Sequence, residues 1–221
     1  MRLAKRTGIR AVLAAGVAVG LGACAGGGGT AANGPAGNPA GVQISGVTRD
    51  TTFRGTEPAT PYRMPDITLQ ADNGDPFNLV HDTAYPVTLV FFGYAHCPDE
   101  CPLILNELAD VYRHLSPGVR SRTQVLFVTT DPRRDTAAAL RAYVGRFDPR
   151  FVGLTGRLPD LLAAADSMGV AVSGMEKLPG GGYDVGHSIQ VIGFRGDEAP
   201  VIWMADTPAA DIEADVRVLA R

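Results

Sequence analysis

The sequence has few cysteines, no long hydrophobic run and no excess of basic residues, and each shortage excludes a class of protein. Three cysteines in 221 residues are not what holds the fold together, since a domain of about 170 residues buries an adequate core without disulfides. The apolar stretch Ala11–Leu21 is shorter than the roughly 20 residues that a membrane-spanning helix needs. No basic stripe with interleaved aromatic residues is present, so nucleic acid is not an expected partner.

The N-terminus has the composition of a bacterial export signal. Four basic residues, Arg2, Lys5, Arg6 and Arg10, precede the apolar stretch, and small residues lead into Cys24. The segment Leu21–Cys24 resembles the lipobox of bacterial lipoproteins, in which the cysteine is acylated and becomes the first residue. A plain signal peptide that ends before a cysteine is the alternative. The resemblance implies that a lipid on Cys24 anchors the protein at the extracytoplasmic face of the cell membrane.

The segment after Cys24 is predicted to be a tether that holds an acidic domain away from the membrane. Residues 25–41 are rich in glycine and contain no large apolar residue, so burial does not offset the entropy of ordering them. Such a chain spans roughly 20 to 30 Å. Removal of residues 1–23 leaves 16 basic and 23 acidic residues, a formal charge of −7, which anionic headgroups would repel. We expect a signal peptide at 1–23, a tether at 24–46 and one domain at 47–221.

Strand and helix patterns alternate along this domain. The turn signal Asn73-Gly74 between two short alternating runs predicts a hairpin. Residues 87–92 and 124–130 are apolar runs typical of strands buried on both faces. Apolar residues at helical spacing follow the first run, at Ile104, Leu108, Val111 and Leu115. Further helices are predicted at 136–147, 157–169 and 208–220, and an antiparallel strand pair at 187–194 and 199–204. This order, a βαβ unit followed by ββα, predicts an α/β thioredoxin-like fold, with a mixed central sheet, flanking helices and an N-terminal hairpin extension.

The motif Cys97-Pro98-Asp99-Glu100-Cys101 lies between the first buried strand and the helix that follows it. Backbone N–H groups at a helix N-terminus favour thiolates, which both a redox dithiol and a metal site require. Thioredoxin-type redox pairs have two residues between the cysteines, whereas three separate them here, and the wider spacing suits a metal. The carboxylates of Asp99 and Glu100 should oppose thiolate formation in the empty site and be neutralised by a cation. Their alternative role is charge complementarity at a helix start.

Two thiolates leave a metal short of a ligand, and His187 is the candidate for the third. It directly precedes the strand expected beside the cysteine strand, where thioredoxins have a cis-proline, and residues 180–199 contain no proline. The other histidines have structural explanations. His81 lies in a loop with no motif around it, and the side chain of His96 is expected to point away from that of its neighbour Cys97. His114 lies near the C-terminus of a helix, where the helix dipole favours a histidine. Two soft thiolates and an imidazole suit Cu(I) and could also hold Cu(II), whereas structural zinc would have four protein ligands. Three methionines, Met168, Met175 and Met204, are expected to fill the core.

Three segments together resemble the SCO/SenC family, copper-binding proteins that assemble cytochrome c oxidase. They are VTLVFFGYAHCPDECP, TTDPRRDTAAALRAYVGRFDPRFVGLTG and YDVGHSIQV, within a resemblance that runs from about Met64 to the C-terminus. It implies that Cys97, Cys101 and His187 bind copper, with Asp99 as the supporting acid inside the cysteine motif. A second motif consists of Asp131, Pro132, Arg134, Asp135 and Thr136. We expect its Asp and Thr residues to fix the loop by capping a helix.

The family resemblance implies delivery of copper to the dinuclear copper centre of cytochrome c oxidase subunit II, or to another copper acceptor, and we expect a monomer. The chain departs from the family in one place, because Gly186 stands where an Asp commonly precedes the histidine, and Asp184 lies two residues earlier. Loss of an acid that positions the imidazole would loosen the site.

Other functions also fit the cysteine pair. One is a thiol-disulfide oxidoreductase that keeps the acceptor's cysteines reduced, which does not need His187. Another is a copper or redox sensor. A peroxiredoxin-like peroxidase is disfavoured, because no arginine lies between Phe91 and Leu105 to activate the cysteine.

Overall fold

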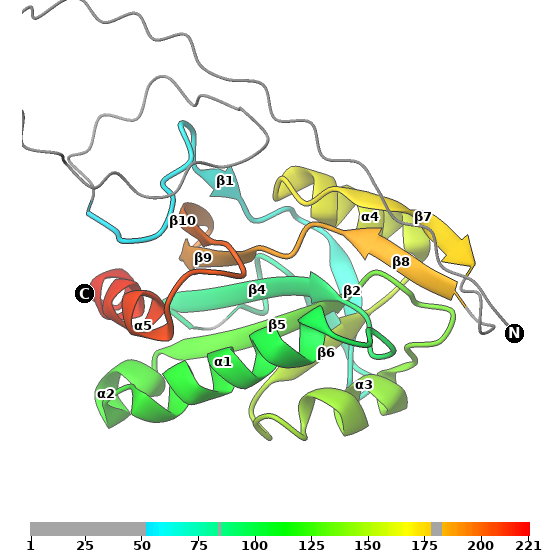
Figure 1. Cartoon of the computed structure of the whole chain (residues 1–221), viewed down its shortest axis with the longest axis horizontal. Coiled ribbons are helices and arrows are strands. Elements are labelled where there is room, and N and C mark those ends of the chain that lie inside the picture. Colours follow the sequence, from blue (N-terminus) through cyan, green and yellow to red (C-terminus); the bar gives the residue numbers. More distant parts are fainter. Residues whose placement is uncertain (1–51, 84, 178–182) are drawn as a thin grey trace, which may run out of the picture. The chain divides into compact units, whose positions relative to one another are not determined.

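A computed structural model describes residues 52–83, 85–177 and 183–221, which all belong to one unit, Ser45–Arg221 (Figure 1). The predicted signal peptide and the whole predicted tether, Cys24 included, lie outside the described residues. None of the helices within the described ranges has the length and apolar content needed to cross a membrane.

An eight-stranded mixed sheet forms the centre of this unit, in the order β1-β10-β9-β4-β5-β6-β2-β3. Its strands are β1 (Tyr62–Arg63), β2 (Thr68–Ala71), β3 (Pro76–Asn78), β4 (Val87–Gly93), β5 (Thr123–Thr129), β6 (Val152–Thr155), β9 (Val191–Arg195) and β10 (Glu198–Trp203). β4 and β6 both pair in parallel with β5, while β9 runs antiparallel to β4 on its other side. β4 and β5 are buried along their whole length, as their continuous apolar sequences predict.

Helices cover both faces of the sheet (Figure 1). The described helices are α1 (Glu100–His114), α2 (Pro117–Arg120), α3 (Ala137–Val144), α4 (Leu158–Ser167) and α5 (Ala209–Leu219). α1, α3 and α5 contribute to one hydrophobic core and α4 to the other. Successive side chains of a strand point to opposite faces, so β4 supplies both cores: Leu89 and Phe91 belong to the first, and Val90 and Phe92 to the second.

The elements predicted around the cysteine motif are present within a few residues of their expected bounds. The predicted hairpin is also present: β2 pairs with β3 across the Asn73-Gly74 turn, where Gly74 has a φ of +94°. This hairpin extends the main sheet itself, because β2 pairs antiparallel with β6. Gly169, at the end of the helix predicted at 157–169, has a φ of +68°, a left-handed conformation that favours glycine.

The sequence patterns do not predict β6, or the two strands β7 (Val172–Lys177) and β8 (Tyr183–His187), which form a separate two-stranded sheet. β6 is only four residues long, and the β7–β8 hairpin is rich in polar residues and glycine. The predicted place of His187 therefore needs a correction. It is the last residue of β8, and three residues separate it from β9.

Candidate functional site

The cysteine loop joins the carboxyl end of β4 to the start of α1. Cys97 lies in the loop and is half-buried, whereas Cys101 is the second residue of α1 and is fully buried. Gly93, the last residue of β4, makes room for the buried sulfur, because a Cβ there would lie 2.8 Å from Cys101 Sγ. The strand end and the helix start thus place both sulfurs at one edge of the sheet, as the sequence predicts.

Cys97 and Cys101 do not form a disulfide, and hydrogen bonds connect the two residues. The Cys101 backbone N–H donates to Cys97 Sγ at 3.4 Å. The thiol of Cys101 also donates to the Cys97 sulfur, and this bond is the main reason why the pKa of Cys97 is lowered to about 5, although burial opposes the shift. The same bond, together with burial, raises the pKa of Cys101. These hydrogen bonds therefore favour the thiolate on Cys97 and the thiol on Cys101.

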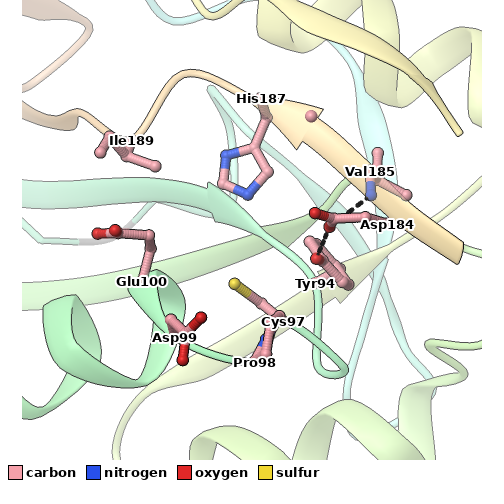
Figure 2. Close-up of a pocket in the computed structure, with 10 residues that line it drawn as sticks. Tyr94, Cys97, Pro98, Asp99, Glu100, Asp184, Val185, His187 and Ile189 are labelled. Carbon is pink, nitrogen blue, oxygen red and sulfur yellow. Dashed lines mark hydrogen bonds between the residues drawn. The ribbon is translucent and has the colours of Figure 1, made fainter. Parts of the chain in front are cut away.

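The carboxylates of Asp99 and Glu100, expected to oppose thiolate formation, do not decide the pKa of Cys97. Hydrogen bonds lower the pKa of this thiol, and neither carboxylate is among the main causes of the shift. Both acids are exposed, so solvent screens their charge. Asp99 stands at the N-cap position of α1, but its side chain makes no capping hydrogen bond, and both residues instead line the cavity beside Cys97 (Figure 2).

His187 faces Cys97 from the opposite side of a cavity of about 210 Å³ (Figure 2). Its Nε2 lies 3.7 Å from Cys101 Sγ, and its Nδ1 lies 3.0 Å from the carbonyl oxygen of Ser188. In the tautomer with the proton on Nδ1, the Nδ1–H group donates a hydrogen bond to that carbonyl. The lone pair of Nε2 then points toward Cys101 Sγ. The rings of Tyr94 and Phe91 contact the imidazole edge-on, with centroids 6.0 and 6.3 Å away.

The distance between Cys101 Sγ and His187 Nε2 suits one shared metal ion. A sulfur and a nitrogen bound to the same metal at about 2.3 and 2.0 Å, with an angle near that of a trigonal site, are about 3.7 Å apart. In the described part of the chain, no three His, Cys, Asp or Glu side chains already stand at the mutual distances of a filled metal site. Cys97, Cys101 and His187 therefore need only a slight adjustment to bind one ion together.

The other histidines are occupied elsewhere. His96 is exposed and its Nδ1 lies 3.6 Å from Asp135 Oδ1, while His114 Nδ1 lies 2.8 Å from the carbonyl of Asp110 in the last turn of α1. Of the methionines, Met168 is buried in the core, as predicted, but Met204 is 43% exposed, so it does not fill the core. The side chain of Met175 lies outside what the structure describes.

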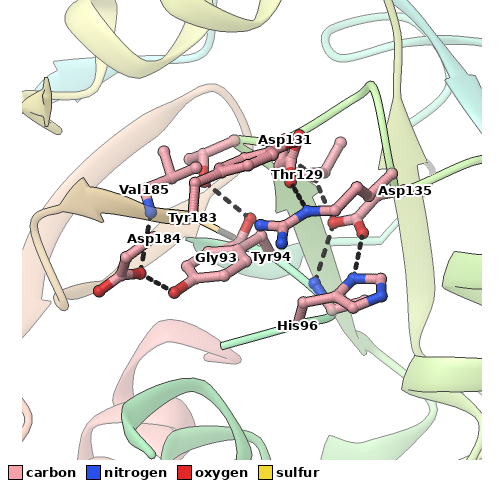
Figure 3. Close-up of polar contacts among 12 residues, drawn as sticks. Gly93, Tyr94, His96, Thr129, Asp131, Asp135, Tyr183, Asp184 and Val185 are labelled. Carbon is pink, nitrogen blue, oxygen red and sulfur yellow. Dashed lines mark hydrogen bonds and ion pairs between the residues drawn. The ribbon is translucent and has the colours of Figure 1, made fainter. Parts of the chain in front are cut away.

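The second motif holds the cysteine loop as well as its own helix. Thr136 caps α3 by accepting from the Ala139 N–H at 3.2 Å, as predicted. Asp135 does not cap the helix: it is fully buried and accepts from the Ala95 N–H at 2.9 Å and from Thr129 Oγ1 at 2.7 Å. It thereby ties the loop before Cys97 to the end of β5 (Figure 3).

Tyr94 and Asp184 are site residues that sequence reasoning missed. The Tyr94 hydroxyl donates to Asp184 Oδ1, which links the cysteine loop to β8 (Figure 3). The tyrosine beside the cysteine motif is the signal that could have found this contact. Gly186, in contrast, lies beside Ser173, whose hydroxyl would have to rotate away to make room for a Cβ at this position. The Ser188 carbonyl orients the imidazole in this chain, so that orientation does not need an acid at Gly186.

Comparisons with known proteins agree with this geometry. A model of the SCO1/SenC family matches residues 64–220. Over 105 residues the chain is 43% identical to the protein SCO2 homolog, mitochondrial, of Bos taurus, a match that covers 47% of this chain and 39% of the bovine protein. The chain thus spans less than half of the length of this curated relative.

Solved structures extend the similarity over nearly the whole domain. Apo Sco1 of Thermus thermophilus is 30% identical, with a TM-score of 0.68 over 77% of this chain and 99% of that protein. Yeast Sco1 with copper bound is 26% identical, with a TM-score of 0.64 over 72% of this chain and 88% of that one. The fold is therefore thioredoxin-like, as the order of strands and helices predicts, and this chain belongs to the SCO1/SenC family.

Proposed function

We propose that this protein binds one copper ion as cargo, through Cys97, Cys101 and His187, and passes it to another copper protein. The observation that carries the proposal is the approach of Cys101 Sγ and His187 Nε2 to 3.7 Å beside the Cys97 sulfur. Two thiolates and an imidazole favour Cu(I), and an added oxygen ligand would allow Cu(II). The yeast relative with the same fold holds copper, which supports the choice of metal.

The acceptor that we propose is the dinuclear copper centre of cytochrome c oxidase subunit II. Membership of a family that includes the Sco1 and SCO2 proteins supports this choice. A site with three protein ligands leaves room for a ligand from the acceptor, so copper would pass by exchange of thiolates without release of the free ion. The cavity mouth, lined by Asp99, Glu100 and Ile189, is where the acceptor would approach.

The protein would act as a monomer at the extracytoplasmic face of the bacterial membrane, held by a lipid on Cys24. We expect the full-length protein to partition with membranes, because a diacylated cysteine supplies two buried chains, and we expect Cys24→Ser to be released or to keep its signal. Mass spectrometry of the native protein is the measurement. A mature chain that carries no lipid and begins elsewhere than Cys24 would contradict this proposal.

Replacement of His187 separates a copper donor from a thiol reductase. We expect His187→Ala to weaken copper binding at least tenfold, about 1.4 kcal/mol, because one of three coordination bonds is lost. The variant should still cycle between dithiol and disulfide, since that exchange needs only an attacking thiolate and a resolving thiol. Competitive copper titration and the dithiol reduction potential are the two measurements.

His96→Ala is the matched control for this experiment, because His96 adjoins Cys97 but is 55% exposed and pairs with Asp135. We expect its copper affinity to stay close to that of the wild type. In cells, His187→Ala should leave oxidase poorly active. If oxidase is fully active in His187→Ala cells but inactive in Cys97→Ala cells, the copper-donor proposal is wrong and the thiol reductase takes its place.

The reductase is the second candidate because of one observation on the cysteines. The pKa of Cys97 is lowered to about 5 by the hydrogen bond from Cys101, so Cys97 is a thiolate at neutral pH with a thiol beside it. A thiol-disulfide oxidoreductase uses the same pair, one thiolate to attack and one thiol to resolve.

A further inference from the structure

His187 is carried by the β7–β8 hairpin, which is not part of the main sheet. Among the described residues, hydrogen bonds from this hairpin to the rest of the domain come from three side chains. They are Tyr183 with Asp131, Asp184 with Tyr94, and His187 with Cys101. The distance from the imidazole to the cysteines therefore depends on side-chain contacts and not on a ladder of backbone hydrogen bonds.

Arg134 lies at the centre of these contacts. Its guanidinium carbon is 3.8 Å from the centroid of the Tyr183 ring and 5.6 Å from that of Tyr94. Its Nε pairs with Asp131 Oδ2, and the other oxygen of Asp131 accepts from the Tyr183 hydroxyl at 2.9 Å (Figure 3). One arginine thus contacts the hairpin, the cysteine loop and the loop after β5.

These contacts are partly removed from water, which makes them stronger than exposed ones. The Arg134 side chain is 24% exposed and that of Asp131 only 3%, so solvent screens their charges weakly. A flat guanidinium over an aromatic face is favoured electrostatically, and more so when it is desolvated. Tyr183 is four residues before His187 on the same strand, about 13 Å away, so a contact at one end of β8 restrains the imidazole at the other.

We propose that Arg134 positions His187 for copper, by stacking on Tyr183 and so fixing the β7–β8 hairpin against the cysteine loop. This inference rests on the proposed function, because it concerns the third ligand of the copper site. Arg134 does not touch the copper ligands in this role and acts through the hairpin. The second motif of the sequence then serves both halves of the site: Asp135 holds the cysteine loop and Arg134 the histidine.

The variants that test this proposal are Tyr183→Ala and Arg134→Lys. Tyr183→Ala removes the stacked ring from a partly exposed position, and Arg134→Lys keeps the charge beside Asp131 but loses the planar group that stacks. We expect each to weaken copper binding about fivefold. Tyr183→Phe keeps the stacked ring and loses only the hydroxyl bonded to Asp131, so it should weaken copper binding less than Tyr183→Ala does. Arg157→Lys, in an exposed pair with Asp160 at the start of α4, controls for a general effect of the substitution.

A double-mutant cycle shows whether the effect passes through His187. In a chain that already carries His187→Ala, we expect Tyr183→Ala and Arg134→Lys to have no further effect on copper affinity. The electron paramagnetic resonance spectrum of the Cu(II) form should show weaker nitrogen coupling in each single variant than in the wild type. An unchanged affinity and spectrum in both variants, or effects that add fully to that of His187→Ala, would overturn the proposal.

A measurement without metal keeps this proposal separate from the proposed function. In the metal-free protein, we expect amide hydrogen exchange in β8 to be at least tenfold faster in Tyr183→Ala than in the wild type, with exchange in β4 unchanged. If the wild type binds no copper, the proposed function fails, and the exchange rates still decide whether Arg134 and Tyr183 hold the hairpin. Equal exchange rates in β8 would refute that.

Discussion

Cys101→Ala should abolish copper binding, with a dissociation constant at least a thousandfold higher, about 4 kcal/mol. Cys101 is fully buried, and its sulfur lies between Gly93, Cys97 and His187. Among the described residues that line the cavity, Cys97 is the one cysteine and no methionine is present, so no other sulfur can replace that of Cys101. In the Cys101→Ala variant, a soft metal keeps Cys97 and His187 as ligands and loses the thiolate of Cys101, which lies between them. Competition with a Cu(I) chelator is the measurement.

Cys97→Ser is the companion variant, because Cys97 is only half-buried and its loss should affect stability less. We expect the same loss of copper, while far-UV circular dichroism and the thermal midpoint stay close to those of the wild type. A stoichiometry of one copper per chain in both variants would remove these cysteines from the site. Loss of copper from Cys101→Ala alone would point to misfolding of that variant, since only the buried position would then be sensitive.

Asp215→Ala should lower the free energy of unfolding by about 3 to 5 kcal/mol. The Asp215 carboxylate on α5 is 1% exposed and accepts three hydrogen bonds: from the Arg54 and Gly55 backbone N–H groups, both at 2.8 Å, and from Trp203 Nε1 at 2.9 Å. The Trp203 donor is buried and the two backbone donors are partly buried, and a buried donor left without a partner costs roughly 1 to 3 kcal/mol. In a domain of this size the thermal midpoint should fall by roughly 10 °C, measured by calorimetry.

Asp211→Ala is the matched control on the same helix. Asp211 pairs with the Arg54 side chain at 2.7 Å, but the arginine side chain is 61% exposed, and exposed pairs contribute little. We expect its thermal midpoint to stay close to that of the wild type. Equal midpoints in Asp215→Ala and the wild type would mean that water replaces the carboxylate. Asp215→Ala that remains folded should bind copper normally, because Asp215 makes no hydrogen bond to a copper ligand.

The sequence alone determined those parts of the protein that depend on neighbours along the chain. Continuous apolar runs predict β4 and β5, and apolar residues at helical spacing predict α1, because burial of a strand or helix face leaves a local period. The position of Cys97 and Cys101 at the start of α1 follows from the same local order. The Asn73-Gly74 turn is predicted from the preference of glycine for a positive φ, which Gly74 shows.

Only the tertiary structure decided how the two halves of the site meet. The β7–β8 hairpin has too little hydrophobic alternation to be predicted, so the strand that carries His187 was missed. The bond between Tyr94 and Asp184 joins residues 90 positions apart, and that between Ala95 and Asp135 joins residues 40 apart. A periodic pattern records which face of an element is buried, but not which distant side chain it will meet there. The contacts that aim the imidazole at the cysteines therefore depend on packing between elements, which leaves no period in the sequence.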